Sequence, residues 1–400
     1  MRYSVLLPTR NRLAYLRYAV ETALGQGYDD MEIVISDNCS EDDIAGYVAS
    51  LGDSRVKYVR TDRPVPVTDN WNNALDHSSG DYVVMLGDDD CLLDGYFEAM
   101  DEVLRKYDSP EVVRTRALLY AYPGVMPGYP DGFLQPFPES GVFKSQADEP
   151  FWIERDEGAA LVQDSLNFRM RFGYNMQFSL ISRTLVDELR VDGKFYHSPF
   201  PDFYASNLLF LGSRRVLVVP QPWVIIGITP KSYGFYHFNG RQDEGIAFLQ
   251  SVPEPALEER LRHVVLPGMY INTGWLYAME ALRMNWAPKQ KLQVGYARYR
   301  ASQIDYVYEH PKRTDADLKA LVERLTPYEK LLFYGYVGGR HAAKLAKRLM
   351  PASFKARLVR ALTRARGEMT AASPEWSAEP IPGRYANIGE VFEQIGAARV

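Results

Sequence analysis

Residues 80–90 read Gly-Asp-Tyr-Val-Val-Met-Leu-Gly-Asp-Asp-Asp, an apolar run followed by three consecutive carboxylates. The run at residues 82–86 has the length and the side chains of a buried strand. Gly87 separates the run from Asp88, Asp89 and Asp90, and a glycine there lets a ligand approach the backbone closely. Adjacent carboxylates repel one another unless a cation or strong donors neutralise them. The stretch predicts a strand that ends in an acidic site, with a cap on a helix over residues 92–107 as the alternative.

The rest of the first hundred residues alternates short apolar runs with helical patterns. This alternation is typical of an α/β fold with a mainly parallel sheet, in which ligands bind at the carboxyl ends of the strands. The spacing predicts strands over residues 3–7, 32–36, 56–60 and 82–86. Polar clusters follow the first and second strands as well as the fourth: Pro8-Thr9-Arg10-Asn11 and Asp37-Asn38-Cys39-Ser40. Either cluster could also be a plain helix N-cap.

The pattern changes along the second half of the chain. A strand over residues 216–219 is predicted to end at Pro220, and long amphipathic helices begin near residue 255. We therefore predict an α/β domain over residues 1–245 and an α-helical C-terminal domain over residues 246–366. The last stretch, residues 367–400, is predicted to be a loosely packed arm.

Composition excludes several classes of protein. The chain has 400 residues, a formal net charge of −5, 24% charged residues and two cysteines. These values fit a globular protein without a disulfide framework or a general attraction to nucleic acid. No apolar stretch reaches the 18 residues that a membrane-spanning helix needs. We expect a cytoplasmic protein with no nucleic-acid partner.

The motifs at residues 8–11, 37–42 and 80–90 resemble, in order and spacing, those of the family-2 glycosyltransferases. Trp71-Asn72 resembles the motif found just before the acidic strand, although the family usually has Arg-Asn there. The resemblance implies a GT-A fold, the Rossmann-like fold of nucleotide-diphospho-sugar transferases, with a mixed, mainly parallel sheet. It also implies an inverting transfer of a sugar to an acceptor hydroxyl in polysaccharide or glycoconjugate synthesis. A UDP-sugar is the favoured donor, and a saccharide or lipid-linked saccharide is the acceptor.

The same resemblance implies roles for individual residues. Asp37 would pair with the base, and Asp88 would lie near the ribose. Asp89 and Asp90 would lie close to a Mn²⁺ or Mg²⁺ ion and the diphosphate, with Asp88 as a further candidate ligand of the metal. His237, on the loop after the last sheet strand, is a candidate additional metal ligand, and a histidine on the surface or packed among aromatic rings is its alternative. The remaining residues implied at the nucleotide-sugar site are Pro8, Thr9, Arg10, Asn11, Asn38 and Asn72.

The resemblance also implies a catalytic carboxylate near the start of a helix, about a hundred residues after the triplet. Asp202 follows Pro201 at that place and is the candidate general base. The family's usual Glu-Asp pair is reduced here to one carboxylate, because Pro201 stands in the first position. A helix cap at Asp202 is the alternative, and Asp192 is the rival base.

Two other functional hypotheses fit parts of the sequence. A haloacid-dehalogenase-type phosphatase also places Asp-x-Asp after a strand, and a catalytically inactive GT-A module could serve as a binding scaffold. Separately, residues 340–366 gather nine Lys and Arg among apolar residues. These basic helices are a candidate surface for peripheral contact with the inner face of the membrane, with a solvated packed face as the alternative. The C-terminal helices are also a candidate for homo-oligomer formation.

Overall fold

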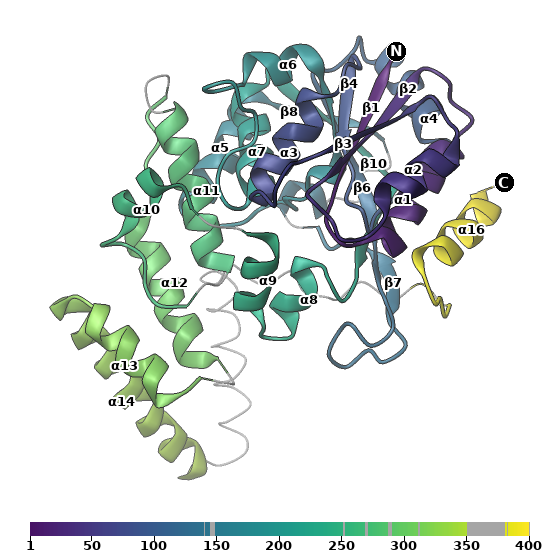
Figure 1. Cartoon of the computed structure of the whole chain (residues 1–400). Helices are drawn as coiled ribbons and strands as arrows, with labels where there is room; N and C mark the ends of the chain where they lie inside the picture. The colour runs from purple at the N-terminus through teal and green to yellow at the C-terminus, as the bar shows by residue number, and fades with distance from the viewer. Residues whose placement is uncertain are drawn as a thin grey trace.

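The structure, a computed structural model, describes residues 1–139, 141–144, 149–250, 253–268, 271–286, 290–310, 313–349, 381 and 383–399 (Figure 1). Its strands are β1 (Tyr3–Thr9), β2 (Met31–Asp37), β3 (Val56–Arg60), β4 (Tyr82–Met85), β5 (Cys91–Leu92), β6 (Val112–Ala121), β7 (Phe133–Pro136), β8 (Phe151–Glu154), β9 (Ser179–Ser182) and β10 (Arg215–Ile228). The helices of the α/β part are α1 (Leu13–Leu24), α2 (Ile44–Leu51), α3 (Val67–Asp76), α4 (Tyr96–Lys106), α5 (Arg155–Leu166), α6 (Arg183–Glu188) and α7 (Pro201–Gly212). The later helices are α8 (Tyr233–Phe238), α9 (Gln242–Leu249), α10 (Pro255–Leu261), α11 (Ile271–Trp286), α12 (Tyr296–Glu309), α13 (Asp315–Arg324), α14 (Pro327–Leu349) and α16 (Ile388–Arg399).

One mixed sheet organises the first 230 residues. Its order is β3-β2-β1-β4-β9-β6-β10-β5, with β7 beside β6 and β8 beside β10. The longest pairings, β1 with β2 and β10 with β6, are parallel. β9 inserts antiparallel between β4 and β6. This confirms the predicted α/β class, with a mainly parallel sheet followed by helices.

Helices cover both faces of the sheet and bury two apolar clusters. On one face, α1, α2, α4 and α16 pack through side chains such as Leu16, Ile44 and Phe97. On the other face, α3, α5, α6, α7 and α11 pack through side chains such as Leu75, Val162 and Trp275. Burial of apolar side chains of this kind is the dominant favourable contribution to folding. The two layers leave the carboxyl ends of β1, β2 and β4 free to carry polar groups.

The strand predicted to end at Pro220 continues instead to Ile228. Proline has no N–H to donate to a sheet ladder, which is why it was expected to end the strand. The pairing of β10 with β6 shifts register between Val219 and Pro222 and again between Pro222 and Val224. These irregularities accommodate both prolines and let β10 pair with β8 before them and with β5 after them.

The later helices form a region with its own small core. Leu266, Val307, Leu321, Leu325 and Phe333 are buried together there. None of the helices in the described ranges is long and apolar enough to cross a bilayer. The predicted basic surface over residues 340–366 lies outside the part of the structure in which side chains are described.

The predicted loose packing of the arm is wrong for its described part, residues 381 and 383–399. Tyr385, Ile388 and Val391 are buried in the core of the α/β part. Helix α16 lies against α1, as Figure 1 shows, and the main chain of residues 385 and 388 bonds to the phenols of Tyr120 and Tyr122. The Ser, Pro and Gly residues of this stretch suggest loose packing, but these apolar side chains anchor its end.

Candidate active site

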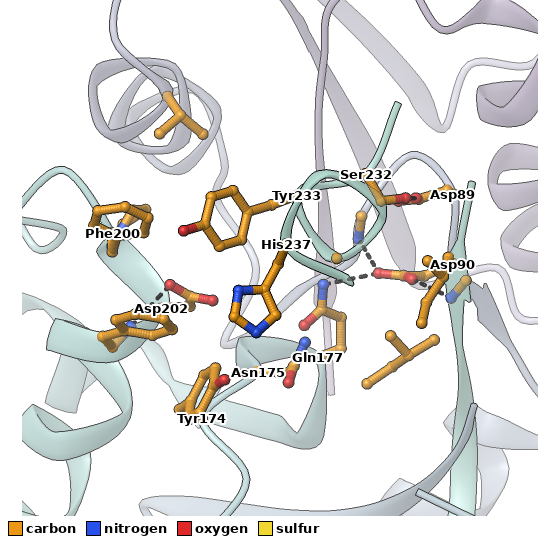
Figure 2. Close-up of a pocket in the computed structure, with 18 of the residues that line it drawn as sticks. Asp89, Asp90, Tyr174, Asn175, Gln177, Phe200, Asp202, Ser232, Tyr233 and His237 are labelled. Atoms are coloured by element: carbon orange, nitrogen blue, oxygen red, sulfur yellow. Dashed lines mark hydrogen bonds between the residues drawn. The ribbon is translucent and has the colours of Figure 1, made fainter. Parts of the chain in front are cut away.

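A cavity of about 450 Å³ opens at the carboxyl ends of β1 and β4. The α/β part supplies the acidic triplet, Thr9 and Asp202, and α8, α9 and α11 close the cavity from the other side. Figure 2 shows Asp90 and Asp202 on opposite sides of this space, with His237 between them. The predicted residues that line it are Pro8, Thr9, Arg10, Asn38, Asp88, Asp89, Asp90, Asp202 and His237. The topology therefore brings together most of the residues that were predicted separately.

The acidic triplet is buried and held by protein donors. Asp90 accepts hydrogen bonds from the backbone N–H of Gly87 at 2.9 Å and of Gly227 at 2.8 Å. Gln177 Nε2 donates to the same carboxylate at 2.7 Å. The triplet does not cap the next helix, because α4 begins at Tyr96 with Gly95 as its N-cap. The cap alternative for Asp88–Asp90 is therefore wrong.

Burial raises the pKa values of Asp88 and Asp90. Loss of water raises the pKa of Asp90 to about 8, and the charge of Asp89 adds to the effect. Burial also raises the pKa of Asp88 to about 6, against the opposing effect of the Arg12 guanidinium. The cluster is thus short of positive charge, an arrangement that is common at functional sites.

Arg12 is one of the site residues that the sequence did not predict. Its Nη1 lies 2.7 Å from Asp88 Oδ1, and its Nη2 contacts Asp89 Oδ2. Nη2 also donates to Thr229 Oγ1 at 3.0 Å. Arg12 directly follows the first polar cluster, residues 8–11. A basic side chain at that place could pair with the three carboxylates, and this is the signal that could have identified it.

The ends of β1 and β2 carry further residues of the cavity lining. Thr9 Oγ1 donates to Asp88 Oδ2 at 2.6 Å, and Arg10 Nη1 donates to the carbonyl of Phe248 at 3.3 Å. Asn38 follows β2, and its side-chain amide donates to the carbonyl of Val65 and accepts from the N–H of the same residue. Thr9, Arg10 and Asn38 line the cavity, as does Pro8.

Three predicted residues lie outside the lining. Asp37 is fully buried and accepts from Arg60 Nη1 at 2.9 Å and from the Tyr58 hydroxyl at 2.7 Å. Asn11 Oδ1 accepts a hydrogen bond from the backbone N–H of Glu41. Asn72 is buried, and its Oδ1 accepts from the backbone N–H groups of residues 195 and 196. In this arrangement these three side chains support the loops around the cavity.

Asp202 lies at the second position of α7, after Pro201. Phe200 is the N-cap, so Asp202 does not cap this helix, and the cap alternative is wrong. Its Oδ1 accepts from the N–H of Phe203 at 2.9 Å. The apolar surroundings raise the pKa of Asp202 to about 7. The rival Asp192 is exposed on a turn away from the cavity.

Aromatic rings enclose Asp202. Phe200 and Phe203 stack with centroids 5.3 Å apart, and Tyr174 meets Phe203 edge to face at 4.4 Å. Figure 2 shows Tyr174, Phe200 and Tyr233 around the carboxylate. Trp275 of α11 packs beneath them and donates its indole N–H to the Ser165 carbonyl at 2.9 Å. The wall of the cavity is therefore apolar and stacked, a surface that suits the face of a sugar ring.

His237 lies one helical turn after Tyr233 on α8. The two rings stack with centroids 6.4 Å apart. Burial lowers the pKa of His237, which keeps the imidazole neutral. Among the described residues, neither His237 Nδ1 nor the Tyr233 hydroxyl has a hydrogen-bond partner, although both atoms are buried. Both side chains line the cavity and can meet a bound molecule.

Comparison with known proteins finds relatives of the first part of the chain. Residues 4–115 match the model of glycosyl transferase family 2. GalNAc(5)-diNAcBac-PP-undecaprenol beta-1,3-glucosyltransferase of Campylobacter jejuni is 39% identical over 97 residues, which are 24% of this chain and 31% of the relative. The putative colanic acid biosynthesis glycosyl transferase WcaA of Escherichia coli is 32% identical over 89 residues, 22% of this chain and 32% of the relative. The chain thus spans about a third of the length of these curated relatives.

Among solved structures, residues 1–349 of TarS from S. aureus, in complex with UDP-GlcNAc, are similar with a TM-score of 0.44 and 16% identity. The match covers 79% of this chain and 83% of that one. The family match includes the strand-end clusters and the acidic triplet, and it confirms the resemblance seen in the motifs. Residues 4–115 of this chain are therefore similar in sequence to glycosyl transferase family 2.

Proposed function

We propose that the chain transfers a sugar from a nucleotide-diphosphate-sugar donor to an acceptor hydroxyl, with inversion at the anomeric carbon. The observation that carries the proposal is the shared cavity, which holds the strand-end carboxylates on one side and the isolated Asp202 on the other. A UDP-sugar is the favoured donor. A saccharide or lipid-linked saccharide is the proposed acceptor, in line with the name of the Campylobacter relative.

The donor side offers polar groups for a nucleotide. Thr9, Arg10 and Asn38 stand at the ends of β1 and β2, where a nucleoside binds in open α/β sheets. Arg10 and Arg12 bring positive charge to the same edge, and guanidinium groups suit diphosphate oxygens. These residues would orient the donor and stabilise the charge on its leaving group.

On the acceptor side, Asp202 would act as the general base. Its carboxylate takes the proton of the acceptor hydroxyl, and the hydroxyl oxygen forms a bond to the anomeric carbon. The bond from that carbon to the diphosphate oxygen breaks on the opposite face, and the nucleoside diphosphate leaves with the electron pair. The aromatic wall would hold the acceptor ring and exclude water.

The donor set of the triplet fits a Mn²⁺ or Mg²⁺ ion. Such ions prefer carboxylate oxygens, and two of the three buried carboxylates, Asp88 and Asp89, share one guanidinium here. In the described part of the chain, no three His, Cys, Asp or Glu side chains are already arranged around a metal position. We propose that Asp88, Asp89 and Asp90, with His237 as a further candidate ligand, would hold the ion. When bound, it would offset charge on the departing diphosphate.

The proposal is tested by separating binding from chemistry. Thermal unfolding with UDP, GDP, dTDP and CMP, each with and without Mn²⁺, identifies the base, since ligand at about 100 times its Kd adds roughly 2.7 kcal/mol of stability. Asp202→Asn should keep this binding and lose at least 100-fold in transfer or donor hydrolysis. Asp192→Asn is the matched control and should retain the wild-type rate.

Three outcomes would contradict the proposal. Binding of none of the nucleotides would favour a scaffold. Phosphate release from a generic phosphate ester would favour the phosphatase. An unchanged rate in Asp202→Asn would remove Asp202 as the base.

A further inference from the structure

Arg12 lies where a cation bound to the triplet would lie. Its two terminal nitrogens contact different carboxylates, Asp88 Oδ1 at 2.7 Å and Asp89 Oδ2. The side chain is only 11% exposed, and it also lines the cavity. The guanidinium therefore bridges the first two members of the triplet from inside the protein.

We infer that Arg12 is the resident counter-ion of the triplet and exchanges with the divalent ion. Binding of the ion displaces the guanidinium from Asp88 and Asp89 and frees it to face the donor diphosphate. This inference rests on the proposed cation site and adds to it a competition that is internal to the chain.

The contacts of the two carboxylates make simultaneous binding unfavourable. Asp88 uses Oδ1 for Arg12 and Oδ2 for the hydroxyl of Thr9. Asp89 Oδ2 accepts from Arg12 and from the hydroxyls of Thr229 and Ser232. A divalent ion on these oxygens would face the guanidinium at short range in a buried place, where like charges repel strongly.

The hydroxyl donors differ from Arg12 in this respect. They are neutral and carry lone pairs, so they can stay beside a metal-bound carboxylate. Arg12 has only donors and a permanent charge. It is therefore the contact that must leave when the ion binds.

The displaced Arg12 side chain could pair with the diphosphate of a donor bound in the same cavity. A planar guanidinium matches two phosphate oxygens at once. Among the described residues, Arg12 Nε is buried without a hydrogen-bond partner, so the present pairing leaves one donor unused. A diphosphate in the cavity would offer acceptor oxygens to the displaced group. Exchange would then return Arg12 to a charged partner.

The test uses Arg12→Gln and, as a matched control, Arg10→Gln. Both arginines lie on the loop after β1 and line the cavity, but Arg10 contacts the carbonyl of Phe248 and makes no ion pair with the triplet in the described structure. Mn²⁺ binding is measured by electron paramagnetic resonance at pH 8.0 without nucleotide. Arg12→Gln should bind Mn²⁺ at least tenfold more tightly than wild type, and Arg10→Gln should match wild type.

The second readout has the opposite sign. In saturating Mn²⁺, Arg12→Gln should bind UDP at least fivefold more weakly than wild type by calorimetry. Mn²⁺ affinity that is equal or lower in Arg12→Gln would overturn the inference, and so would unchanged UDP affinity. If Arg12→Gln fails to fold, Arg12→Lys replaces it. Because lysine keeps the charge but cannot bridge both carboxylates, Mn²⁺ should bind this variant more tightly than wild type, and equal affinity would overturn the inference.

Failure of the inference is distinguishable from failure of the proposed function. If Mn²⁺ binds wild type and both variants with the same affinity, only the exchange is wrong. If Mn²⁺ binds none of them, the cation site is wrong and the exchange with it. Nucleotide binding and the effect of Asp202→Asn remain independent of both results.

Discussion

Thr9 and Asp88 are joined by a hydrogen bond of 2.6 Å between Thr9 Oγ1 and Asp88 Oδ2, although they stand 79 positions apart. Both belong to the edge where β1 and β4 end, and these strands are parallel neighbours. The contact links the first polar cluster of the chain to the acidic triplet. Replacing the hydroxyl of Thr9 by a methyl group, as in Thr9→Val, removes this bond.

Thr9→Val should therefore destabilise the protein. A hydrogen bond to a buried charged acceptor contributes about 2 kcal/mol, and valine leaves Asp88 Oδ2 without this donor. Thr9→Ser keeps the hydroxyl and should lose less than half as much. Urea unfolding of the three proteins measures the difference. Equal stability of the valine and serine variants would show that the bond contributes nothing.

Asp202 should make the protein less stable as the pH rises through neutrality. Its pKa is raised to about 7 in the folded state, against about 3.9 in an unfolded chain. Between these values the folded state holds a proton that the unfolded state has lost, so the free energy of unfolding falls as the pH rises from about 4 to 7.

Asp202→Asn lacks this titration. The variant should be more stable than wild type at pH 8, by about 1–2 kcal/mol because the carboxylate partly faces the cavity, and the gap should close toward pH 4. Chemical denaturation at four pH values checks the trend. A constant difference across that range would contradict the raised pKa.

Ionisation of Asp202, which lowers the stability of the protein, should increase the rate of transfer. A general base works only when ionised, so kcat/KM should rise with pH and level off above about pH 7. The profile is measured at fixed Mn²⁺ with nucleotide affinity recorded in parallel, since Asp88 and Asp90 also titrate near this range. A kcat/KM that is independent of pH between 5 and 8 would contradict a role for Asp202 as the base.

Asn72→Ala should damage stability more than donor binding. Asn72 accepts from two backbone N–H groups and donates to the carbonyl of Tyr196 at 2.9 Å, so alanine leaves buried groups unpaired. We expect a loss of about 3 kcal/mol. UDP affinity, measured well below the unfolding temperature, should change less than threefold. A stable variant that has lost UDP binding would instead support the nucleotide-site role implied by the motif.

Trp275→Phe should lower activity through the wall beneath Asp202. Phenylalanine keeps a ring against Phe203 and Tyr174 but loses the bond to Ser165. We expect a loss of about 1 kcal/mol in stability and a reduced kcat with nearly unchanged UDP affinity. Trp275→Ala, which removes a fully buried ring, should cost about 3–5 kcal/mol. A wild-type kcat in Trp275→Phe would show that the packing of α11 does not affect the chemical step.

The sequence was sufficient for the strand-end clusters because parallel strands bring their carboxyl ends to one edge. That rule alone places Thr9 beside the triplet. It cannot place Arg12, whose role depends on the direction of a loop side chain. It does not apply to Asn72, which the family resemblance implies at the nucleotide-sugar site and which here accepts from the backbone of residues 195 and 196.

Tyr174 and Gln177 were not predicted because no motif marks them: Tyr174 lies in a loop, and Gln177 lies in the short 3₁₀ helix Met176–Phe178 just before β9. Their positions follow from β9, which inserts between β4 and β6 and carries the preceding turn to the cavity. Side-chain direction and strand insertion depend on contacts that are distant in the chain. The local sequence pattern therefore predicts the residues at the strand ends, whereas the other residues that line the cavity are known only from the tertiary structure.

The packing of α16 against α1 has a consequence for biosynthesis. Ile388 and Val391 are fully buried against the N-terminal layers, and Tyr385 is held by the phenol of Tyr120. While the ribosome is still adding the helical region, the surface of α1 and β6 that these side chains cover must remain exposed to water. We expect a chaperone that recognises apolar surface to bind there during translation, and release to follow only after residue 391 leaves the exit tunnel.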